Sequence, residues 1–149
     1  MKEITPYLMF SGNCREAMEF YQKCTGGELN VMTYGDMEPK TPPDEKHWLI
    51  HARLAKGSTV LMASDSHSGS PVKVGNNVWL SFTCETDDEV AKLCASLGAG
   101  GKEIMAPHDA FWGARFAMVT DRFGVNWMLN HEKPSPVMSK LKGELAAAR

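Results

Sequence analysis

Apolar residues recur along this chain with two different spacings, which predict strands and helices in a fixed order. Residues 4–10 are mostly apolar and stop at a Ser-Gly pair, a pattern typical of a strand that ends in a turn. The spacing then becomes helical, and a Gly-Gly pair marks the end of that helix. Asn13, with Glu16 three residues later, is expected to begin the helix as a capping box. The apolar stripe of this helix consists of Cys14, Ala17, Met18 and Tyr21.

Three further strands are predicted in the first half of the chain. Residues 28–34, 47–55 and 58–64 are apolar, strand-like runs. A polar, proline-rich loop over residues 35–46 separates the first of these runs from the second. A Lys-Gly pair joins the last two runs, and two residues ending in glycine are typical of a tight hairpin.

The same order of patterns recurs in the second half. Predicted strands cover residues 77–84, 102–106, 111–120 and 125–131. Thr86 and Glu89 form a second capping-box pattern. The helical stripe that follows consists of Val90, Leu93, Cys94 and Leu97, and several glycines end the helix. A shift of 72 residues places Leu80 on Leu8 and Gly98 on Gly26, so the second half repeats the first.

This repeat predicts an α+β fold of two tandem βαβββ modules, residues 4–64 and 77–131, within one domain over residues 4–131. Two such modules can pair their mixed sheets into a curved trough, with the helices outside and a cleft inside. Residues 132–149 form a tail with the pattern of a short amphipathic helix. The apolar positions of that helix are Val137, Leu141 and Leu145.

Composition and charge narrow the class of protein. With 149 residues, 43% apolar and 23% charged, the chain has a globular composition and the length of one ordinary domain. A net charge of -2 gives no electrostatic footprint for nucleic acid or an acidic membrane. No apolar run approaches the ~20 residues of a membrane-spanning helix, and no secretory pattern opens the chain. A cytoplasmic protein is expected.

The four cysteines predict structural thiols. None of Cys14, Cys24, Cys84 and Cys94 belongs to a CxxC pair, which excludes zinc-ribbon and thioredoxin patterns. Three of the four, Cys14, Cys24 and Cys94, fall in predicted helices, where a free cysteine packs as a small hydrophobic residue. Reduced thiols are expected because disulfides are rare in the cytosol.

Motifs at both ends of the predicted domain point to a known group of proteins. Residues 113–127 read Gly-Ala-Arg-Phe-Ala-Met-Val-Thr-Asp-Arg-Phe-Gly-Val-Asn-Trp, residues 5–8 Thr-Pro-Tyr-Leu, and residues 10–14 Phe-Ser-Gly-Asn-Cys. With the repeated βαβββ order, the chain resembles the vicinal-oxygen-chelate superfamily, and more narrowly its PhnB-like branch. The superfamily includes glyoxalase I, extradiol dioxygenases, fosfomycin-modifying enzymes and bleomycin-binding proteins. The resemblance implies a homodimer, whose modules are paired within one chain or swapped between two.

Members of this branch often carry the label of a demethylubiquinone methyltransferase. The sequence has no glycine-rich loop between a strand and a helix that would hold S-adenosylmethionine. That activity is therefore not predicted.

The resemblance also implies positions for a divalent metal. Enzymes of the superfamily take one metal ligand from the first and one from the last strand of each module, and the metal polarises two vicinal oxygens of the substrate. In this chain those four positions hold Pro6, Met62, Val78 and Met128. In sites of this kind zinc, nickel, manganese and iron(II) take imidazole or carboxylate ligands, whereas a thioether suits copper(I). We expect no metal cofactor, with the methionines packing as apolar residues.

Polar candidates for the trough follow from the predicted hairpins. If Lys56-Gly57 is a two-residue turn, His51 lies opposite Met62, and Arg53 shares their face. A four-residue turn in the second module would pair Arg115 with Asn130, and Ala117 with Met128. The predicted ligand-binding residues are Leu8, Phe10, His51, Arg53, Met62, Leu80, Phe82, Arg115, Asn126 and Met128, with Asn130 beside them.

Three side chains in this set have opposing interpretations. His51 is the candidate catalytic residue, as a general base or a hydrogen-bond partner of a ligand, but it is also consistent with a half-buried sheet histidine. Arg53 and Arg115 suit a bidentate clamp on a carboxylate or phosphonate, although arginines at the rim of a sheet often pair with acids. Asp65, just past a predicted strand, is interpreted as a turn-capping residue rather than a base.

Three functions remain open from the sequence. The first is a metal-independent member of the superfamily that binds a small, partly apolar ligand in the trough. The second is a lyase- or transferase-type enzyme that uses His51 with Arg53 or Arg115, or a metal at unorthodox positions. The third is a structural or interaction protein whose trough is filled by its own side chains. The sequence identifies no particular ligand or substrate.

Overall fold

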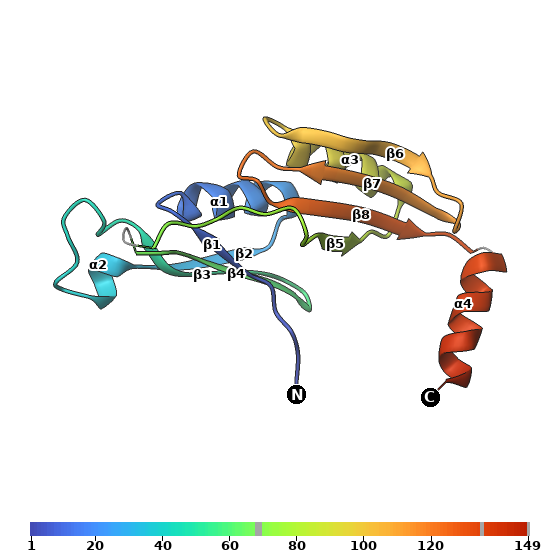
Figure 1. Cartoon of the computed structure of the whole chain (residues 1–149), viewed down its shortest axis with the longest axis horizontal. Coiled ribbons are helices and arrows are strands. Elements are labelled where there is room, and N and C mark those ends of the chain that lie inside the picture. Colours follow the sequence, from blue (N-terminus) through green and yellow to red (C-terminus); the bar gives the residue numbers. More distant parts are fainter. Residues whose placement is uncertain (68–69, 135, 149) are drawn as a thin grey trace. The chain divides into compact units, whose positions relative to one another are not determined.

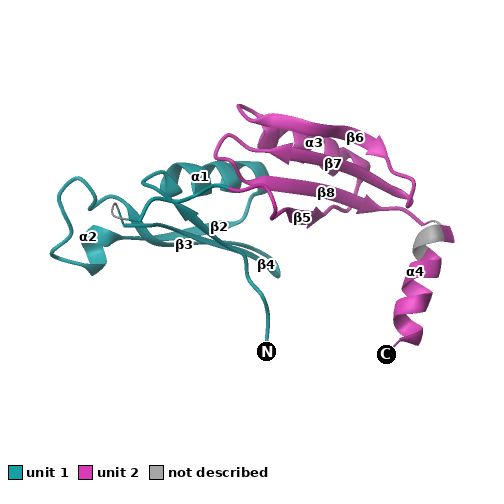
Figure 2. Ribbon diagram, viewed as in Figure 1, with its two compact units in different colours: residues 1–74 teal, residues 75–149 magenta. Residues whose placement is uncertain are grey.

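The computed structural model describes residues 1–67, 70–134 and 136–148, which separate into two compact units of residues 1–74 and 75–149 (Figure 2). Each unit contains a four-stranded mixed sheet with a helix packed on one face (Figure 1). The order of strand, helix and three strands predicted for each module is therefore confirmed. Within the described residues, no helix has both the length and the apolar character that a membrane span requires.

In unit 1 the first strand, β1, lies at the edge of the sheet and pairs with the last strand, β4. Its elements are β1 (Tyr7–Phe10), α1 (Cys14–Thr25), β2 (Glu28–Thr33), α2 (Tyr34–Met37), β3 (Leu49–Lys56) and β4 (Thr59–Asp65). The sheet order is β1-β4-β3-β2, with β1 parallel to β4 and the other pairs antiparallel. Strand β1 starts three residues later than the sequence pattern predicts, and the loop after β2 includes the short helix α2.

Helix α1 packs on the sheet of unit 1 through the predicted stripe, since Cys14, Ala17, Met18 and Tyr21 are all buried. Asn13 is the N-cap residue, as the predicted capping box requires, but its side chain makes no capping hydrogen bond. The buried carboxylate of Asp65 takes over this role. Its Oδ1 accepts hydrogen bonds from the backbone N–H groups of Gly12 (2.8 Å) and Cys14 (3.0 Å). The sequence predicts that Asp65 caps the turn after its own strand; instead its carboxylate caps the start of α1, a helix far away in the sequence.

Unit 2 repeats this topology. Its elements are β5 (Leu80–Thr83), α3 (Asp87–Gly98), β6 (Lys102–Asp109), β7 (Ala114–Thr120), β8 (Asn126–Glu132) and α4 (Pro136–Ala147). The sheet order is β5-β8-β7-β6, with β5 parallel to β8. Strand β6 is longer than predicted and includes Pro107 and His108, which the sequence pattern assigned to a loop.

Helix α3 starts with the capping pattern that the sequence predicts. The hydroxyl of Thr86 accepts a hydrogen bond from the backbone N–H of Glu89 (3.1 Å), and the Glu89 carboxylate accepts one from the backbone N–H of Glu85 (2.7 Å). The stripe of Val90, Leu93, Cys94 and Leu97 is buried as predicted. Both helices therefore owe their packing to an apolar face at helical spacing.

The two hairpins differ from the predicted registers. In unit 1, Met62 pairs with Arg53 rather than with His51, a shift of two residues, because β3 continues to Lys56 and the turn begins at Gly57. In unit 2, Arg115 pairs with His131 rather than with Asn130, a shift of one residue. A shift of two residues keeps every side chain on its face, whereas a shift of one exchanges the faces.

The remaining predictions concern the tail and the cysteines. Helix α4 is present, and Leu141 and Leu145 on it are exposed; the side chain of Val137 lies outside the described residues. All four cysteines are free, as predicted, and three are buried: Cys14, Cys84 and Cys94. Burial is the largest cause that raises the pKa of Cys14 to about 12 and those of Cys84 and Cys94 to about 11, which keeps these thiols protonated.

Candidate functional site

Helix α1 covers one face of the sheet of unit 1, and we call the opposite face the open face of unit 1. One row of paired residues crosses all four strands on the open face: Tyr7, Met62, Arg53 and Asn30. Met9 and Met32 belong to the same face, because Met9 pairs with Ser64 and Met32 with His51. Tyr7, Met9 and Met32 are 46%, 45% and 43% exposed, so apolar and aromatic groups gather here in contact with solvent.

His51 and Tyr7 are joined on this face. The Tyr7 hydroxyl lies 3.0 Å from Nδ1 of His51, a hydrogen bond, and the two ring centroids are 5.7 Å apart. The bond crosses from β1 to β3 over the intervening strand β4. It holds one ring nitrogen and leaves Nε2 of His51 without a partner among the described residues. The sequence offered no signal for this pair, because Tyr7 stands in an unbroken apolar run.

Arg53 occupies the middle of the open face. Among the residues that the structure describes, its guanidinium has no ion pair and no hydrogen bond, and the side chain is exposed. The acid on this face, Glu28, accepts a hydrogen bond from the Asn30 amide (3.0 Å). The predicted grouping of His51, Arg53 and Met62 on one face is therefore confirmed, although their register is not.

Leu8 and Phe10 lie on the opposite, α1-covered face, which corrects their predicted position. Leu8 pairs with Ala63, and Phe10 pairs with Asp65; Phe10, Ala63 and Asp65 are buried. The four residues Tyr7-Leu8-Met9-Phe10 are all apolar or aromatic, so no alternation in the sequence indicates which side faces the helix.

On the open face of unit 2, opposite α3, two rows of described residues cross all four strands and contain no Asp, Glu, Lys or Arg. One row consists of Ser81, Met128, Met118 and Met105, and the next of Thr83, Asn130, Phe116 and His108. Met128 and Asn130 are thus on the open face as predicted. Leu80 and Phe82 are not: Leu80 pairs with the buried Trp127, and Phe82 stacks on the Trp127 ring at 5.2 Å, on the α3 side of the sheet.

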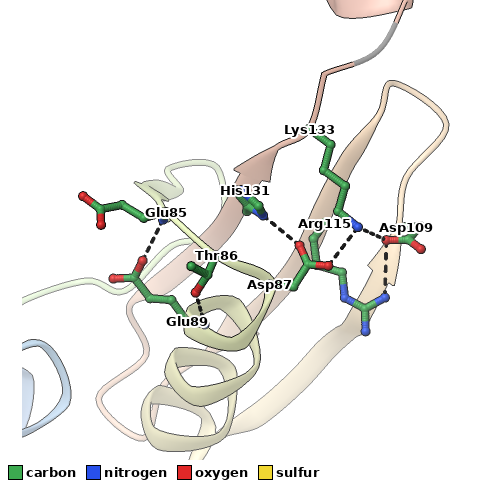
Figure 3. A network of polar contacts seen from close by, with 8 residues as sticks. All are labelled: Glu85, Thr86, Asp87, Glu89, Asp109, Arg115, His131 and Lys133. Carbon is green, nitrogen blue, oxygen red and sulfur yellow. Dashed lines mark hydrogen bonds and ion pairs between the residues drawn. The ribbon is translucent and has the colours of Figure 1, made fainter.

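Arg115 also lies on the α3 side, where it joins a charged network (Figure 3). Its guanidinium is 3.5 Å from Oδ1 of Asp109, which also binds Lys133 (3.0 Å). Asp87, at the start of α3, binds Lys133 (2.8 Å) and Nδ1 of His131 (2.7 Å). Hydrogen bonds that Lys133 and His131 donate to Asp87 hold the pKa of this carboxyl below its usual range. The hydrogen bonds that Lys133 donates to Asp87 and Asp109 raise the pKa of Lys133. Arg115 therefore pairs with an acid, the alternative that the sequence left open.

Asn126 has both ends of its amide engaged within unit 2. Thr120 donates a hydrogen bond to its Oδ1 (2.8 Å), and its Nδ2 donates to the backbone carbonyl of Val78 (3.2 Å). These bonds tie the segment before β5 to β8. Asn126 is also buried. Its predicted contact with a ligand remains a prediction.

The four positions implied for a metal do not fit a divalent ion. Pro6 has no side-chain donor, and its carbonyl accepts a hydrogen bond from the backbone N–H of Met62 (3.1 Å). Val78 is an exposed aliphatic residue whose carbonyl is occupied by Asn126. Met62 and Met128 present thioethers. Within the described residues, no group of three or more His, Cys, Asp or Glu side chains is arranged to hold a metal ion.

Comparison with known proteins agrees with the repeated fold of the two units. The sequence pattern of the Glyoxalase/Bleomycin resistance protein/Dioxygenase superfamily matches residues 3–129. Protein YjdN of Escherichia coli is 32% identical over 89% of this chain and 97% of its own length. The structure of PA1353 from Pseudomonas aeruginosa is 41% identical over 90% of this chain and 100% of its own, with a TM-score of 0.80. The structure of a PhnB protein from Bacillus cereus is 26% identical over 87% of this chain and 99% of its own, with a TM-score of 0.72. From its sequence and its two repeated units alike, the chain belongs to the glyoxalase/bleomycin resistance protein/dioxygenase superfamily.

Proposed function

We propose that this chain is a metal-independent member of the superfamily that binds a small, partly apolar ligand on its open sheet faces. Membership of the family does not decide between binding and catalysis, because its name covers enzymes as well as a resistance protein. The observation that carries the proposal is the row of Tyr7, Met62, Arg53 and Asn30, which places the polar groups of Arg53 and Asn30 beside the apolar surface of Met62 and Tyr7.

The apolar part of the ligand would cover the exposed methionines and tyrosine of unit 1. Tyr7, Met9 and Met32 are each close to half exposed, although large apolar side chains are usually well buried. Covering apolar surface stabilises a complex by roughly 25 cal/mol per Å². Methionine side chains are flexible and polarisable, so they can adapt to ligands of different shape.

The metal-independent part of the proposal is supported by the chemistry of four positions. Pro6 and Val78 supply no side-chain ligand, and Met62 and Met128 supply only thioethers. Thioethers bind soft ions such as copper(I) and not the harder divalent ions that polarise oxygen. Metal analysis of protein purified without chelators is therefore expected to find less than stoichiometric Zn, Ni, Mn and Fe.

The enzymatic alternative is favoured by one observation, the hydrogen bond between Tyr7 and His51. A histidine held by a second side chain is a common arrangement for a general base. A bound metal at one ion per chain, lost together with a catalytic activity in the His51→Ala variant, would favour this alternative and contradict metal independence.

A thermal-shift screen with small aromatic and aliphatic compounds tests binding itself. A ligand that binds the folded chain raises the melting temperature in a saturable manner. We expect His51→Ala and Met62→Lys to reduce this shift, while Lys92→Ala on the exposed surface of α3 leaves it unchanged. If no compound in a broad screen shifts the melting temperature, the ligand-binding proposal fails. Sedimentation velocity tests the homodimer that the family resemblance implies.

A further inference from the structure

Arg53 is a cation on the open face of unit 1 for which the described residues provide no ion-pair partner. Its neighbours in the row are Met62 on β4 and Asn30 on β2, and neither provides an anion. An exposed arginine at the rim of a protein usually finds a carboxylate or extends into water. Here the guanidinium has no hydrogen-bond or ion-pair partner among the described residues, and Arg53 has Met62 beside it on β4, while Met32 on β2 pairs with the nearby His51. Its five donors are available to a ligand.

His51 provides a further donor close to Arg53. The two residues are two positions apart on β3 and point to the same face, so their Cα atoms are about 7 Å apart. When the Tyr7 hydroxyl donates to Nδ1, the neutral imidazole carries its proton on Nε2. Nε2–H can then donate to the ligand that Arg53 binds. In this arrangement Tyr7 acts as a positioning residue for the ring of His51.

The charges on the open face favour a single negative charge in the ligand. The ionisable strand residues there are Tyr7 on β1, Glu28 on β2, and His51 and Arg53 on β3, while β4 contributes none. Glu28 lies opposite Ala55, and its carboxylate accepts a hydrogen bond from the side-chain amide of Asn30, two residues further along β2. Among these strand residues Arg53 is the single permanent cation. One guanidinium and one imidazole match a planar monoanion better than a dianion, which requires more positive charge.

We propose that the ligand of the open face of unit 1 is a carboxylate with an apolar body. The two carboxylate oxygens accept hydrogen bonds from the guanidinium of Arg53, and one of them also accepts from Nε2–H of His51. The apolar body covers Met9, Met32 and Met62. This inference rests on the proposed ligand-binding function and adds the chemical class of the polar group.

The test is a matched library of carboxylic acids and their primary amides, from butanoate to decanoate and from benzoate to 4-phenylbutanoate. Each pair shares its apolar body and differs in charge. Affinities are measured by isothermal titration calorimetry at pH 7. We expect the acids to bind roughly 10- to 100-fold more tightly than the amides, the range that a charge-assisted hydrogen-bonding pair supplies.

Three variants separate Arg53 from a general effect of charge. Arg53→Gln is expected to reduce acid affinity to that of the amide and to leave amide affinity unchanged. Arg53→Lys keeps the charge but lacks the planar fork, so it should retain an intermediate affinity. Arg15→Gln removes the same charge from the exposed surface of α1 and is expected to have no effect. Circular dichroism and melting temperature establish that each variant is folded.

The outcomes distinguish this inference from the function on which it rests. If acids and amides bind equally, or if Arg53→Gln weakens both alike, the carboxylate inference is overturned while ligand binding stands. If Arg15→Gln weakens acids as strongly as Arg53→Gln, long-range charge and not a site explains the preference. If neither half of the library binds, the proposed function and the inference both fail.

Discussion

Replacing Asp65 by alanine tests how unit 1 holds its helix. The Asp65 side chain is buried at the end of β4 and accepts three backbone hydrogen bonds. Two come from Gly12 and Cys14 at the start of α1, and the third comes from Leu49 (2.9 Å) at the start of β3. One carboxylate therefore joins three segments of the unit.

The magnitude follows from the groups that lose their partner. Cys14 and Leu49 are fully buried, so neither N–H can turn to water when the carboxylate is removed. A buried donor without a partner costs about 1–3 kcal/mol. With the partly buried N–H of Gly12 included, we expect Asp65→Ala to lower the free energy of unfolding by about 3–5 kcal/mol.

Asparagine at the same position sharpens the test. Its single amide oxygen can keep the bonds from Gly12 and Cys14, but its NH₂ group would then face the N–H of Leu49, donor against donor. We expect Asp65→Asn to cost about 1–3 kcal/mol, between alanine and the wild type. Asp88→Asn on the exposed start of α3 is the control, since its pair with Lys92 is solvated and worth less than about 1 kcal/mol.

Urea unfolding followed by circular dichroism gives these differences, provided that the slope of the transition is unchanged. Amide hydrogen exchange then locates the effect. Protection at Leu49 should fall in both variants, and protection at Cys14 chiefly in Asp65→Ala, in each case more than protection in α3. A loss of less than about 1 kcal/mol for Asp65→Ala, or equal loss of protection in both helices, would refute the role assigned to this carboxylate.

Three further predictions concern thiols, a helix cap and an ion pair. In the folded chain at pH 8 only Cys24 should react with Ellman's reagent at an appreciable rate, because the other three thiols are buried and have raised pKa values. Rapid reaction of two or more thiols would contradict this. Thr86→Ala should cost about 1 kcal/mol in urea unfolding, with Thr86→Ser close to wild type. The lowered pKa of Asp87 means that its contribution to stability is present above the usual pKa of aspartate and is lost as the pH falls through the lower folded value. The difference in melting temperature between wild type and Asp87→Asn should accordingly shrink below about pH 4; a constant difference down to pH 2 would count against it.

The helices and their packing could be predicted because their signal is local. The stripes of α1 and α3 repeat at helical spacing, and all eight stripe residues are buried. The capping pattern of Thr86 and Glu89 is also local and is correct. The start of α1 could not be predicted from its neighbourhood, because the acceptor that replaces the Asn13 cap comes from Asp65, at the other end of the unit.

The face of the sheet on which each candidate residue lies depends on the register of its hairpin, and so on the length and start of the turn. In the first hairpin the error of two residues kept His51 and Arg53 on the open face. In the second, the carboxylate of Asp121 accepts hydrogen bonds from the backbone N–H groups of Phe123 and Val125, and the turn includes five residues rather than four. That single extra residue exchanges the faces and moves Arg115 to the side of α3.

The pairing of β1 with β4 has a consequence for the synthesis of this chain on the ribosome. The first strand of unit 1 has β4, the last strand made, as its neighbour in the sheet, and α1 lacks the acceptor for its first N–H groups until Asp65 has been added. A nascent chain that stops before Asp65 therefore has neither element in place. We expect unit 1 to fold in one late step, once the segment to Asp65 has left the exit tunnel.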